Sequence, residues 1–392
     1  MSAVKTIYLD NSATTKICDE ALKKYIEVSE NNFGNPSSLH TLGFNAEKEL
    51  DAARAAVLSS IGDKDGTVIF TASGSEANNL AIIGRALSKE RYKKSAKIIT
   101  SMGEHASVSS PFASLAAMGF KTWEIPTKDG RLDLDALEKE LTGEVILVSV
   151  MMVNNETGAL YDIQALSKLV KQKCPEALIH IDATQSYMKV KFTRRSLGAD
   201  MITLSSHKIE GPKGVGALVI DNKIIKTKGL APQILGGGQE GGMRSGTENV
   251  PAVAAFGEAI RVGMKNIDEN IAKLESLRAS LIEKITGDDI LSAISVTDPE
   301  SHAPHIVNLT LPSIKSETAL HFLSSLGIYV SSGSACSSNS NHKSSALTAY
   351  GRSEAEADSS IRISFSHRND ESDVEALADG LRQALTKLAR KR

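Results

Sequence analysis

The strongest constraint on the fold is a series of short, continuously apolar segments separated by amphipathic stretches. We expect strands at TVIFT (67–71), KIITS (97–101), VILVSVM (145–151), LIHID (178–182), MITLS (201–205) and GALVI (216–220). Such runs do not alternate polar and apolar residues, which is typical of strands buried on both faces by crossover helices. The pattern therefore predicts an α/β domain with a largely parallel sheet.

Helical stretches at 75–89 and Asp162–Lys173 lie between several of these strands. A longer helical pattern begins near Asn266 and continues to Ile285, with no strand directly after it. We expect it to lead into a second domain that includes HIVNLTL (305–311) and a last helix near Ser372–Leu388. The length of 392 residues fits two domains, because ordinary domains contain roughly 100–200 residues.

Composition excludes several classes of protein. The chain has 45 Lys and Arg against 47 Asp and Glu, so it lacks the basic excess of a dedicated nucleic-acid binder. Its three cysteines, Cys18, Cys174 and Cys336, are far apart, and they form neither a disulfide framework nor a Cys-x-x-Cys zinc pattern. No signal peptide or membrane-spanning apolar run is visible. We therefore expect a cytoplasmic protein in a reducing compartment.

Two segments are rich in small residues. Residues 236–246 contain six glycines, and residues 331–345 contain eight serines. On composition alone, both are interpreted as flexible linkers. The sequence also lacks GxGxxG after a strand, GxxxxGK[ST], GxSxG and HExxH, so the common nucleotide and hydrolase signatures do not apply.

Polar side chains follow several of the expected strands. Asp182 ends one strand, where α/β sheets bind ligands, although it could instead cap the next helix. Lys208 follows the next strand and is either a surface lysine or an amine nucleophile. His105 follows a third strand and could be only a partly buried histidine. We expect these side chains to share one edge of the sheet.

A possible phosphate site precedes the helix predicted at 75–89. Gly74 allows a tight turn and Ser75 is the expected N-cap, so the free N–H groups of that helix would suit a phosphate. An ordinary capped helix is the alternative. Together, a lysine, a carboxylate, phosphate donors and a flat side chain are the groups that a pyridine aldehyde phosphate requires.

Taken in order, the motifs resemble those of the pyridoxal-phosphate-dependent cysteine desulfurases, in particular the NifS/IscS-like group of the class V aminotransferases. The matching segments cover nearly the whole chain: YLDNSATT (8–15), GNPSS (34–38), SGSEANN (73–79), GEHAS (103–107), NNETG (154–158), HIDATQ (180–185), SSHKIEGPKG (205–214), GGGQE and RSGTEN (236–249), SSGSACSS (331–338) and IRISF (361–365). The resemblance implies the type I fold of pyridoxal-phosphate enzymes. This fold has a large domain with a mainly parallel seven-stranded sheet and a smaller α/β C-terminal domain. We expect residues 15–262 in the large domain. Residues 1–14 and 263–392 would form the small one, with a mobile cysteine loop at about 329–345.

The resemblance also implies a role for each matching residue. Lys208 would be the Schiff-base lysine and would move the Cα proton of the substrate. Asp182 would keep the pyridine nitrogen protonated, and His105 would stack on the ring. The remaining cofactor contacts would come from Gly74 and Ser75, Asn155, Gln185, Ser205, His207, and Thr247 of a neighbouring subunit in a homodimer. Arg362, assisted by Asn155, would bind the substrate carboxylate.

Cys336 is the residue on which the implied activity depends. Its thiolate would attack the sulfur of bound L-cysteine, giving a persulfide on the enzyme and releasing L-alanine. The resemblance implies delivery of this sulfur to an acceptor protein, such as an iron–sulfur scaffold with transient cluster contact through Cys336. Transfer RNA thiolation and cofactor sulfuration are alternative destinations for the sulfur. We expect no direct nucleic-acid binding, no membrane association and no resident metal.

Two departures from the family pattern concern the mouth of the site and the acceptor. Gly241 stands where many relatives have an arginine, and SNSNHKSS follows the cysteine where many relatives read LEPS. Two other classes share part of the pattern. One is an aminotransferase or selenocysteine lyase, which would need Lys208 and Asp182 but not Cys336. The other is a non-catalytic relative, which would not need Lys208, Asp182 and His105 together.

Overall fold

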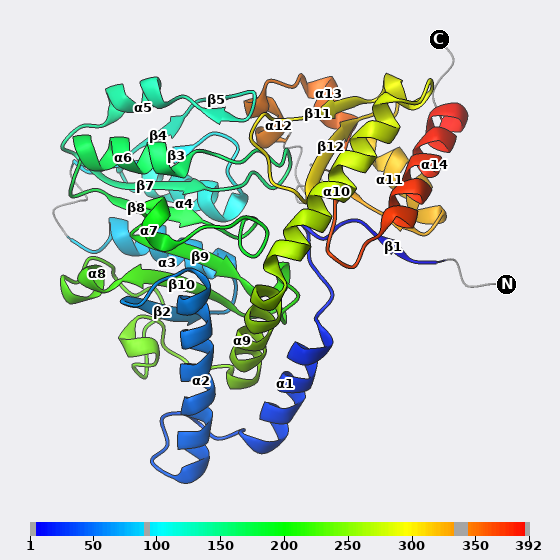
Figure 1. Ribbon diagram of the computed structural model, residues 1–392. Coiled ribbons are helices and arrows are strands. Elements are labelled where there is room, and N and C mark those ends of the chain that lie inside the picture. The colour runs from blue at the N-terminus through cyan, green and yellow to red at the C-terminus, as the bar shows by residue number, and fades with distance from the viewer. Residues whose placement is uncertain (1–4, 90–94, 333–343, 389–392) are drawn as a thin grey trace.

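The computed structural model describes residues 5–89, 95–332 and 344–388. A seven-stranded sheet forms its larger part (Figure 1). Across the sheet the strands lie in the order β2 (Gly66–Thr71), β10 (Gly216–Asp221), β9 (Met201–Ser205), β8 (Leu178–Asp182), β7 (Val145–Met151), β3 (Lys97–Ser101) and β4 (Lys121–Ile125). β10 runs antiparallel to both of its neighbours, and the strands from β9 to β4 are parallel. The predicted α/β class and the mainly parallel seven-stranded sheet are confirmed.

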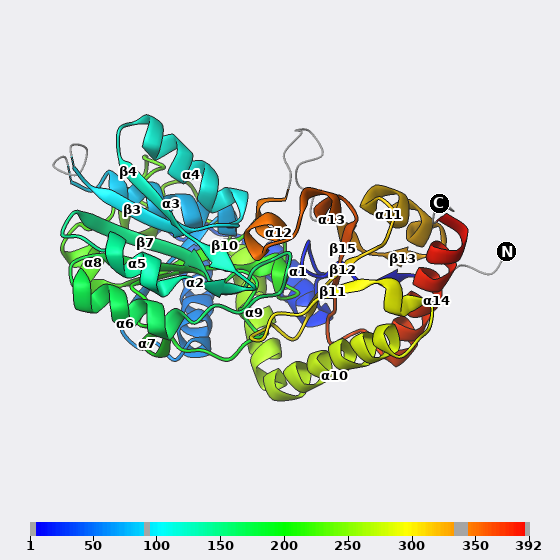
Figure 2. The ribbon, with the colours of Figure 1, turned by 90° about the horizontal axis from the view of Figure 1, so that it is seen from above.

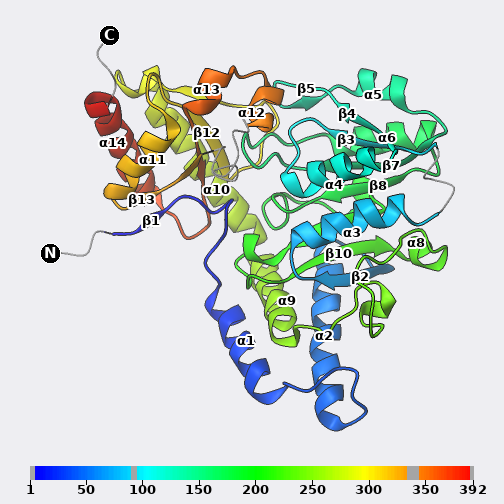
Figure 3. The same cartoon turned by 180° about the vertical axis from the view of Figure 1, so that it is seen from behind.

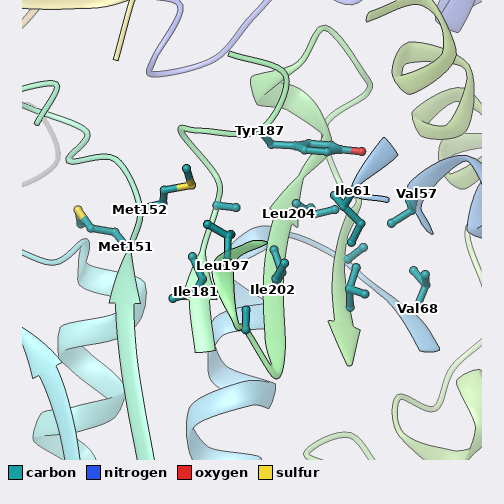
Figure 4. Packing of buried hydrophobic residues seen from close by; sticks show 14 of the residues in the cluster. Val57, Ile61, Val68, Met151, Met152, Ile181, Tyr187, Leu197, Ile202 and Leu204 are labelled. Carbon is teal, nitrogen blue, oxygen red and sulfur yellow. The ribbon is translucent and has the colours of Figure 1, made fainter. Parts of the chain in front are cut away.

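The apolar runs form strands because helices cover both faces of the sheet. Successive residues of a strand point to opposite faces, so Ile98 packs with α3 (Gly74–Ala86) and α4 (Ala106–Ala117), whereas Ile99 packs on the other side. That second face is covered by α2 (Thr41–Ser60), α6 (Ile163–Lys173) and α9 (Val250–Lys265) (Figure 2). Figure 4 shows part of this core, where Val57 of α2 and Ile61, the residue after that helix, lie beside the sheet.

β4 is the strand that the apolar pattern did not reveal. Its sequence KTWEI lies at an edge of the sheet, and most of its side chains are exposed. An edge strand needs no continuous apolar run, because one side of it faces solvent. The other elements of this part of the molecule are short or lie outside the sheet: α1 (Asp19–Asn31), β5 (Thr127–Lys128), β6 (Arg131–Leu132), α5 (Leu134–Glu140), α7 (Arg194–Leu197) and α8 (Asn222–Lys226).

A smaller antiparallel sheet has its own hydrophobic core. Its strands lie in the order β11 (Ser295–Thr297), β12 (Ile306–Thr310), β15 (Ser360–Ser364) and β14 (Ser331–Ser332). Helices α10 (Ile267–Thr286), α11 (Ser316–Ser325) and α14 (Glu371–Leu388) supply apolar side chains to this core. The short helices α12 (Ser345–Tyr350) and α13 (Glu354–Asp358) precede β15.

The N-terminal segment also reaches this smaller sheet (Figure 3). β1 (Ile7–Tyr8) pairs in parallel with β13 (Ile328–Tyr329), and Asp10 forms a bridge with Ser364 of β15. The domain boundaries expected from the sequence stay a prediction. Among the described helices, none combines the length and apolar character that crossing a membrane requires.

The interpretation of residues 236–246 as a flexible linker is wrong. Glu240 in this segment is buried, and its carboxylate accepts hydrogen bonds from the Arg54 guanidinium at 2.6 and 2.8 Å. The same carboxylate accepts a hydrogen bond from the backbone N–H of Phe70 in β2, at 2.9 Å. The glycine-rich segment is therefore attached to the edge of the large sheet. Of the serine-rich segment, residues 333–343 lie outside the described residues.

Candidate active site

One cavity of about 780 Å³ lies beyond the carboxyl ends of the large sheet. Its wall contains nearly all the side chains singled out in the sequence: Gly74, Ser75, His105, Asn155, Asp182, Gln185, Ser205, His207, Lys208 and Arg362. They meet because β2, β3, β8 and β9 all end at this edge. Arg362 comes instead from β15 of the smaller sheet. The cavity thus collects groups from two sheets.

Lys208 ends a short 3-10 helix, Ser206–Lys208, that directly follows β9. Its Nζ donates hydrogen bonds to the backbone carbonyls of Ser12 at 2.5 Å and Ala13 at 2.7 Å. These two carbonyls belong to the N-terminal motif YLDNSATT, so a segment nearly two hundred residues away holds the amine at the cavity wall.

Asp182 ends β8 and is 6% exposed. Its carboxylate accepts a hydrogen bond from Asn78 Nδ2 at 2.8 Å and another from the backbone N–H of Thr184 at 2.9 Å. Two fixed donors orient the carboxylate, which lines the cavity on the same side as the N-terminal turns of α3. The arrangement can hold a protonated ring nitrogen of a bound heterocycle.

The N-terminus of α3 provides a site for an anion. Ser73, and not Ser75 as expected, is the N-cap, because Ser73 Oγ accepts a hydrogen bond from the backbone N–H of Glu76. The N–H groups of Gly74 and Ser75 lie in the first turn, where a helix offers donors without intrahelical partners. A Cβ atom at Gly74 would lie 3.2 Å from Ser205 Cβ, so a side chain at this position would crowd Ser205. The helix start, Ser75, Ser205 and His207 all line the cavity, and this donor set suits a phosphate.

His207 is a neutral donor or acceptor in this site. Burial, followed by the positive charges of Lys208, Lys213 and Lys189, lowers its pKa to about 4. Its Nδ1 lies 3.1 Å from Thr14 Oγ1. The imidazole is therefore uncharged at neutral pH and can contribute a hydrogen bond to an anion without titrating.

His105 is the N-cap of α4, and its side chain lines the cavity. The residue is exposed, but the surrounding wall desolvates its imidazole and so lowers its pKa. The positive charges of Lys208 and Arg362 act in the same direction, against the charge of Asp182. The ring is consequently neutral at pH 7. A neutral, flat imidazole can lie against an aromatic ligand without repelling a positive charge on it.

Arg362 is held in position while part of its guanidinium stays unpaired. It donates hydrogen bonds to the backbone carbonyl of Asn155 at 2.9 Å and to Asp10 Oδ1 at 3.0 Å. Its Nε is buried and has no hydrogen-bond partner among the described residues. A buried donor without a partner costs about 1–3 kcal/mol, so a ligand carboxylate would gain from occupying this position.

The other predicted residues differ in their placement. Gln185 lines the cavity, and its amide donates a hydrogen bond to the carbonyl of Ser12 at 2.9 Å. Thr247 is exposed and does not line the cavity of its own chain. Cys336 lies outside the described residues, but Ser332 and Ser344 on either side of 333–343 both line the cavity.

Four further residues with functional contacts were not predicted from the sequence. Asp10 accepts a hydrogen bond from Arg362, and Asn78 donates one to Asp182. Ser107 forms a hydrogen bond with His105, and Glu156 accepts one from Ser344 at 2.5 Å. Asp10 and Asn78 lie inside the motifs YLDNSATT and SGSEANN, so only their position beside recognisable residues could have indicated them.

The site thus combines a lysine, a carboxylate and an anion site at the end of a large, mainly parallel sheet with an arginine from a smaller sheet. These features define the protein as an α/β enzyme with its active site between two sheets. The chain belongs to the class-V aminotransferase family, whose model matches residues 7–377.

Within that family the chain is similar to cysteine desulfurases. It is 35% identical to Cysteine desulfurase IscS 1 of Archaeoglobus fulgidus, over 97% of each chain. A solved NifS-like protein superposes with a TM-score of 0.90 at 31% identity, covering 98% of this chain and all of the other. The structure of SspA in complex with cysteine matches with a TM-score of 0.79 at 30% identity, covering 93% of this chain and 100% of that one.

Proposed function

We propose that this chain is a cysteine desulfurase that uses pyridoxal 5'-phosphate to convert L-cysteine to L-alanine and transfers the sulfur to Cys336 as a persulfide. The observation that carries the proposal is that Lys208, Asp182, His105 and Arg362 line one cavity together with the anion site at the start of α3. The similarity to IscS 1 of Archaeoglobus fulgidus over nearly the whole chain supports the same activity.

The cavity residues fit pyridoxal phosphate by their chemistry. The start of α3, Ser75, Ser205 and His207 would hold the phosphate, and Asp182 would bind the protonated ring nitrogen. Asn155 and Gln185 would contact the ring oxygen, and His105 would lie on the ring. When bound, the cofactor supplies an electron sink for the chemistry at the substrate's Cα and Cβ atoms. Lys208 would attach it covalently and carry the Cα proton.

Arg362 and Cys336 would act on the substrate itself. Arg362, with the unpaired Nε described above, would bind the carboxylate of L-cysteine and fix its orientation, assisted by Asn155. Cys336 as a thiolate would attack the substrate sulfur and form the S–S bond while the Cβ–S bond breaks. The Cβ atom would keep the electron pair of that bond and take up a proton, which leaves alanine. Ser332 and Ser344 line the cavity on both sides of 333–343, which supports this role for a residue between them.

A homodimer accounts for two features of the surface. Thr247 is exposed, and large apolar side chains are exposed where α1 meets α2, with Phe33 at 66%, Leu39 at 107% and Phe44 at 54%. This end of the two helices projects beyond the sheet in Figures 1 and 3. A second copy would cover such a surface and bring Thr247 to the phosphate of its partner.

The persulfide must then pass to an acceptor. We infer an acceptor protein such as an iron–sulfur scaffold, and a reducing compartment such as the cytoplasm, because the Cys336 thiol must be regenerated after each transfer.

Alanine formation from L-cysteine tests the proposed function. The whole chain, reconstituted with pyridoxal phosphate, is expected to release alanine from L-cysteine in the presence of a thiol reductant, with one sulfide for each alanine. Parallel reactions contain L-selenocysteine, or an amino acid with a keto-acid acceptor. Transamination without alanine formation from cysteine would identify an aminotransferase instead, and a strong preference for L-selenocysteine would identify a lyase.

Arg362→Lys is expected to weaken substrate binding. Lysine retains the charge but cannot form the fork of hydrogen bonds that a guanidinium offers a carboxylate. Loss of one charged hydrogen bond, worth about 1.5–3 kcal/mol, corresponds to a rise of about tenfold to a hundredfold in KM for L-cysteine. Arg261→Lys, an exposed position on α9, is the control and should leave KM unchanged. An unaltered KM in Arg362→Lys would contradict the assignment.

A further inference from the structure

A chain of hydrogen bonds joins Asp182 to His105 through two residues that the proposed mechanism does not use. Asn78 Nδ2 donates to Asp182 Oδ2 at 2.8 Å and to Ser107 Oγ at 2.9 Å. Ser107 Oγ lies 2.8 Å from His105 Nδ1, and the backbone N–H of Ser107 donates to the same nitrogen at 3.1 Å. Asn78 comes from α3 and Ser107 from α4, so the chain crosses between two helices.

The chemistry of Asp182 fixes the direction of every bond in this chain. A carboxylate only accepts hydrogen bonds, so the amide nitrogen of Asn78 must face it. Both hydrogens of that nitrogen are then used, one on Asp182 and one on Ser107 Oγ. The opposite atom, Asn78 Oδ1, is left buried without a partner among the described residues, and Asn78 as a whole is 1% exposed. Leaving a buried acceptor unpaired is costly, so this orientation is maintained by the contacts on the nitrogen.

The orientation of Asn78 determines where the proton of His105 lies. Because Ser107 Oγ accepts from Asn78, its own hydrogen is directed to His105 Nδ1. The backbone N–H of Ser107 points to the same ring nitrogen. A nitrogen that faces two donors carries no hydrogen itself, so the ring is in the neutral form with its hydrogen on Nε2.

We propose that Asn78 is a positioning residue that, through Ser107, holds His105 as a neutral imidazole protonated on Nε2. The inference rests on the proposed function, since it gives His105 its place beside the cofactor ring. The same amide orients the carboxylate of Asp182. Asn78 thereby orients both Asp182, which would bind the ring nitrogen, and His105, which would lie on the ring face.

The charges around His105 show why these hydrogen bonds are needed to keep the imidazole neutral. Asp182 at the end of β8 favours protonation of the imidazole, whereas Lys208 after β9, Arg362 in β15 and burial oppose it. Burial is the largest of these influences, and the resulting pKa is below its ordinary value. An imidazolium would repel the protonated pyridine ring that Asp182 is proposed to stabilise. The hydrogen bonds from Ser107 penalise that state, because Nδ1 would then direct a hydrogen at two donors.

Nitrogen NMR of the holoenzyme labelled with 15N-histidine tests the proposal. Nine histidines are present, and a His105→Gln spectrum identifies the signals of His105. In the native protein we expect the Nε2–H form at pH 7 and above. In Asn78→Ala the pKa of His105 should rise by about one unit, and a fraction of Nδ1–H should appear. An Nδ1–H or protonated ring at pH 7 in the native protein would overturn the proposal.

Two further variants keep the test decisive. Ser107→Ala removes the hydroxyl but keeps the backbone donor, so a smaller shift in the same direction is expected, even if Asn78→Ala does not fold. Asn79→Ala is the matched control, because Asn79 also lies on α3 but its amide donates to the carbonyl of Ser75 and does not line the cavity. It should leave His105 unchanged. If neither Asn78→Ala nor Ser107→Ala altered the tautomer or the pKa, the proposal would be wrong.

The NMR readout is also separate from the proposed function. A protein that bound no pyridoxal phosphate and formed no alanine would contradict the desulfurase assignment, and the tautomer of His105 would still be measured in that protein. A desulfurase with full activity and an Nδ1–H form of His105 would contradict only the role given to Asn78.

Discussion

Lys208→Ala is expected to abolish covalent attachment of pyridoxal phosphate and to reduce alanine formation by about a thousandfold or more. The reason is positional. The Nζ of Lys208 is held at the cavity wall by the carbonyls of Ser12 and Ala13, and no other lysine side chain lines this cavity among the described residues. Borohydride reduction of the native holoenzyme, followed by peptide mass analysis, should tag Lys208, and the variant should give no tagged lysine.

Two other lysines serve as comparisons for this experiment. Lys213 is exposed a few residues further along, so Lys213→Ala should retain both the tag and the activity. Lys189 is the more demanding comparison, because burial lowers its pKa to about 7 and makes its amine a stronger competitor. Its Nζ, however, donates to the backbone carbonyl of Lys208 at 2.8 Å, and Lys189 lines a smaller cavity, which Lys208 also lines, but not the large one. A tag on Lys189 or Lys213 in the native protein would show that the assignment of Lys208 is wrong.

Cys336→Ala is expected to leave cofactor binding intact and to lower alanine formation from L-cysteine by at least about a hundredfold. Without the thiolate, the substrate sulfur has no nucleophile to accept it, so the Cβ–S bond cannot be broken by transfer. The absorbance of the bound cofactor should match that of the native protein, because the cofactor residues are unchanged. Full production of alanine and sulfide in this variant would contradict the thiolate mechanism.

Cys18 and Cys174 provide the matched controls. Both are buried, and burial raises the pKa of each thiol, which makes them poor nucleophiles at neutral pH. Cys174 also donates its S–H to the carbonyl of Thr142 at 3.1 Å. Their replacement by alanine should change stability slightly and leave persulfide formation unaltered.

Much of the fold was predictable because burial leaves a direct trace in the sequence. Runs such as VILVSVM gave β7 with the predicted bounds, since a strand covered on both faces must be apolar throughout. The same reasoning could not find β4, whose exposed KTWEI is an edge strand. It also failed at 236–246, where glycine content suggested a linker but Glu240 bonds with Arg54, a residue far away in the chain.

The residues of the candidate active site were also predictable only in part. Lys208, Asp182 and His105 could be proposed because each lies at or shortly after the end of a strand, and strand ends meet at one edge of a parallel sheet. The contacts that orient them could not, because Asn78, Ser107 and Asp10 have no distinctive spacing. Asp10 and Arg362 are 352 residues apart and meet only where the N-terminal segment lies beside β15. Sequence patterns thus indicate the reacting groups, whereas the hydrogen bonds that orient them emerge only in the folded chain.

The central claim is that sulfur leaves L-cysteine and becomes bound to Cys336. The most direct measurement is a single turnover of the holoenzyme with L-cysteine labelled at sulfur, followed by rapid alkylation and mass analysis of the peptide that contains Cys336. We predict one labelled sulfur atom on Cys336 for each alanine released, and none on Cys18 or Cys174. Alanine released with no label on Cys336, or label on another cysteine, would contradict the account.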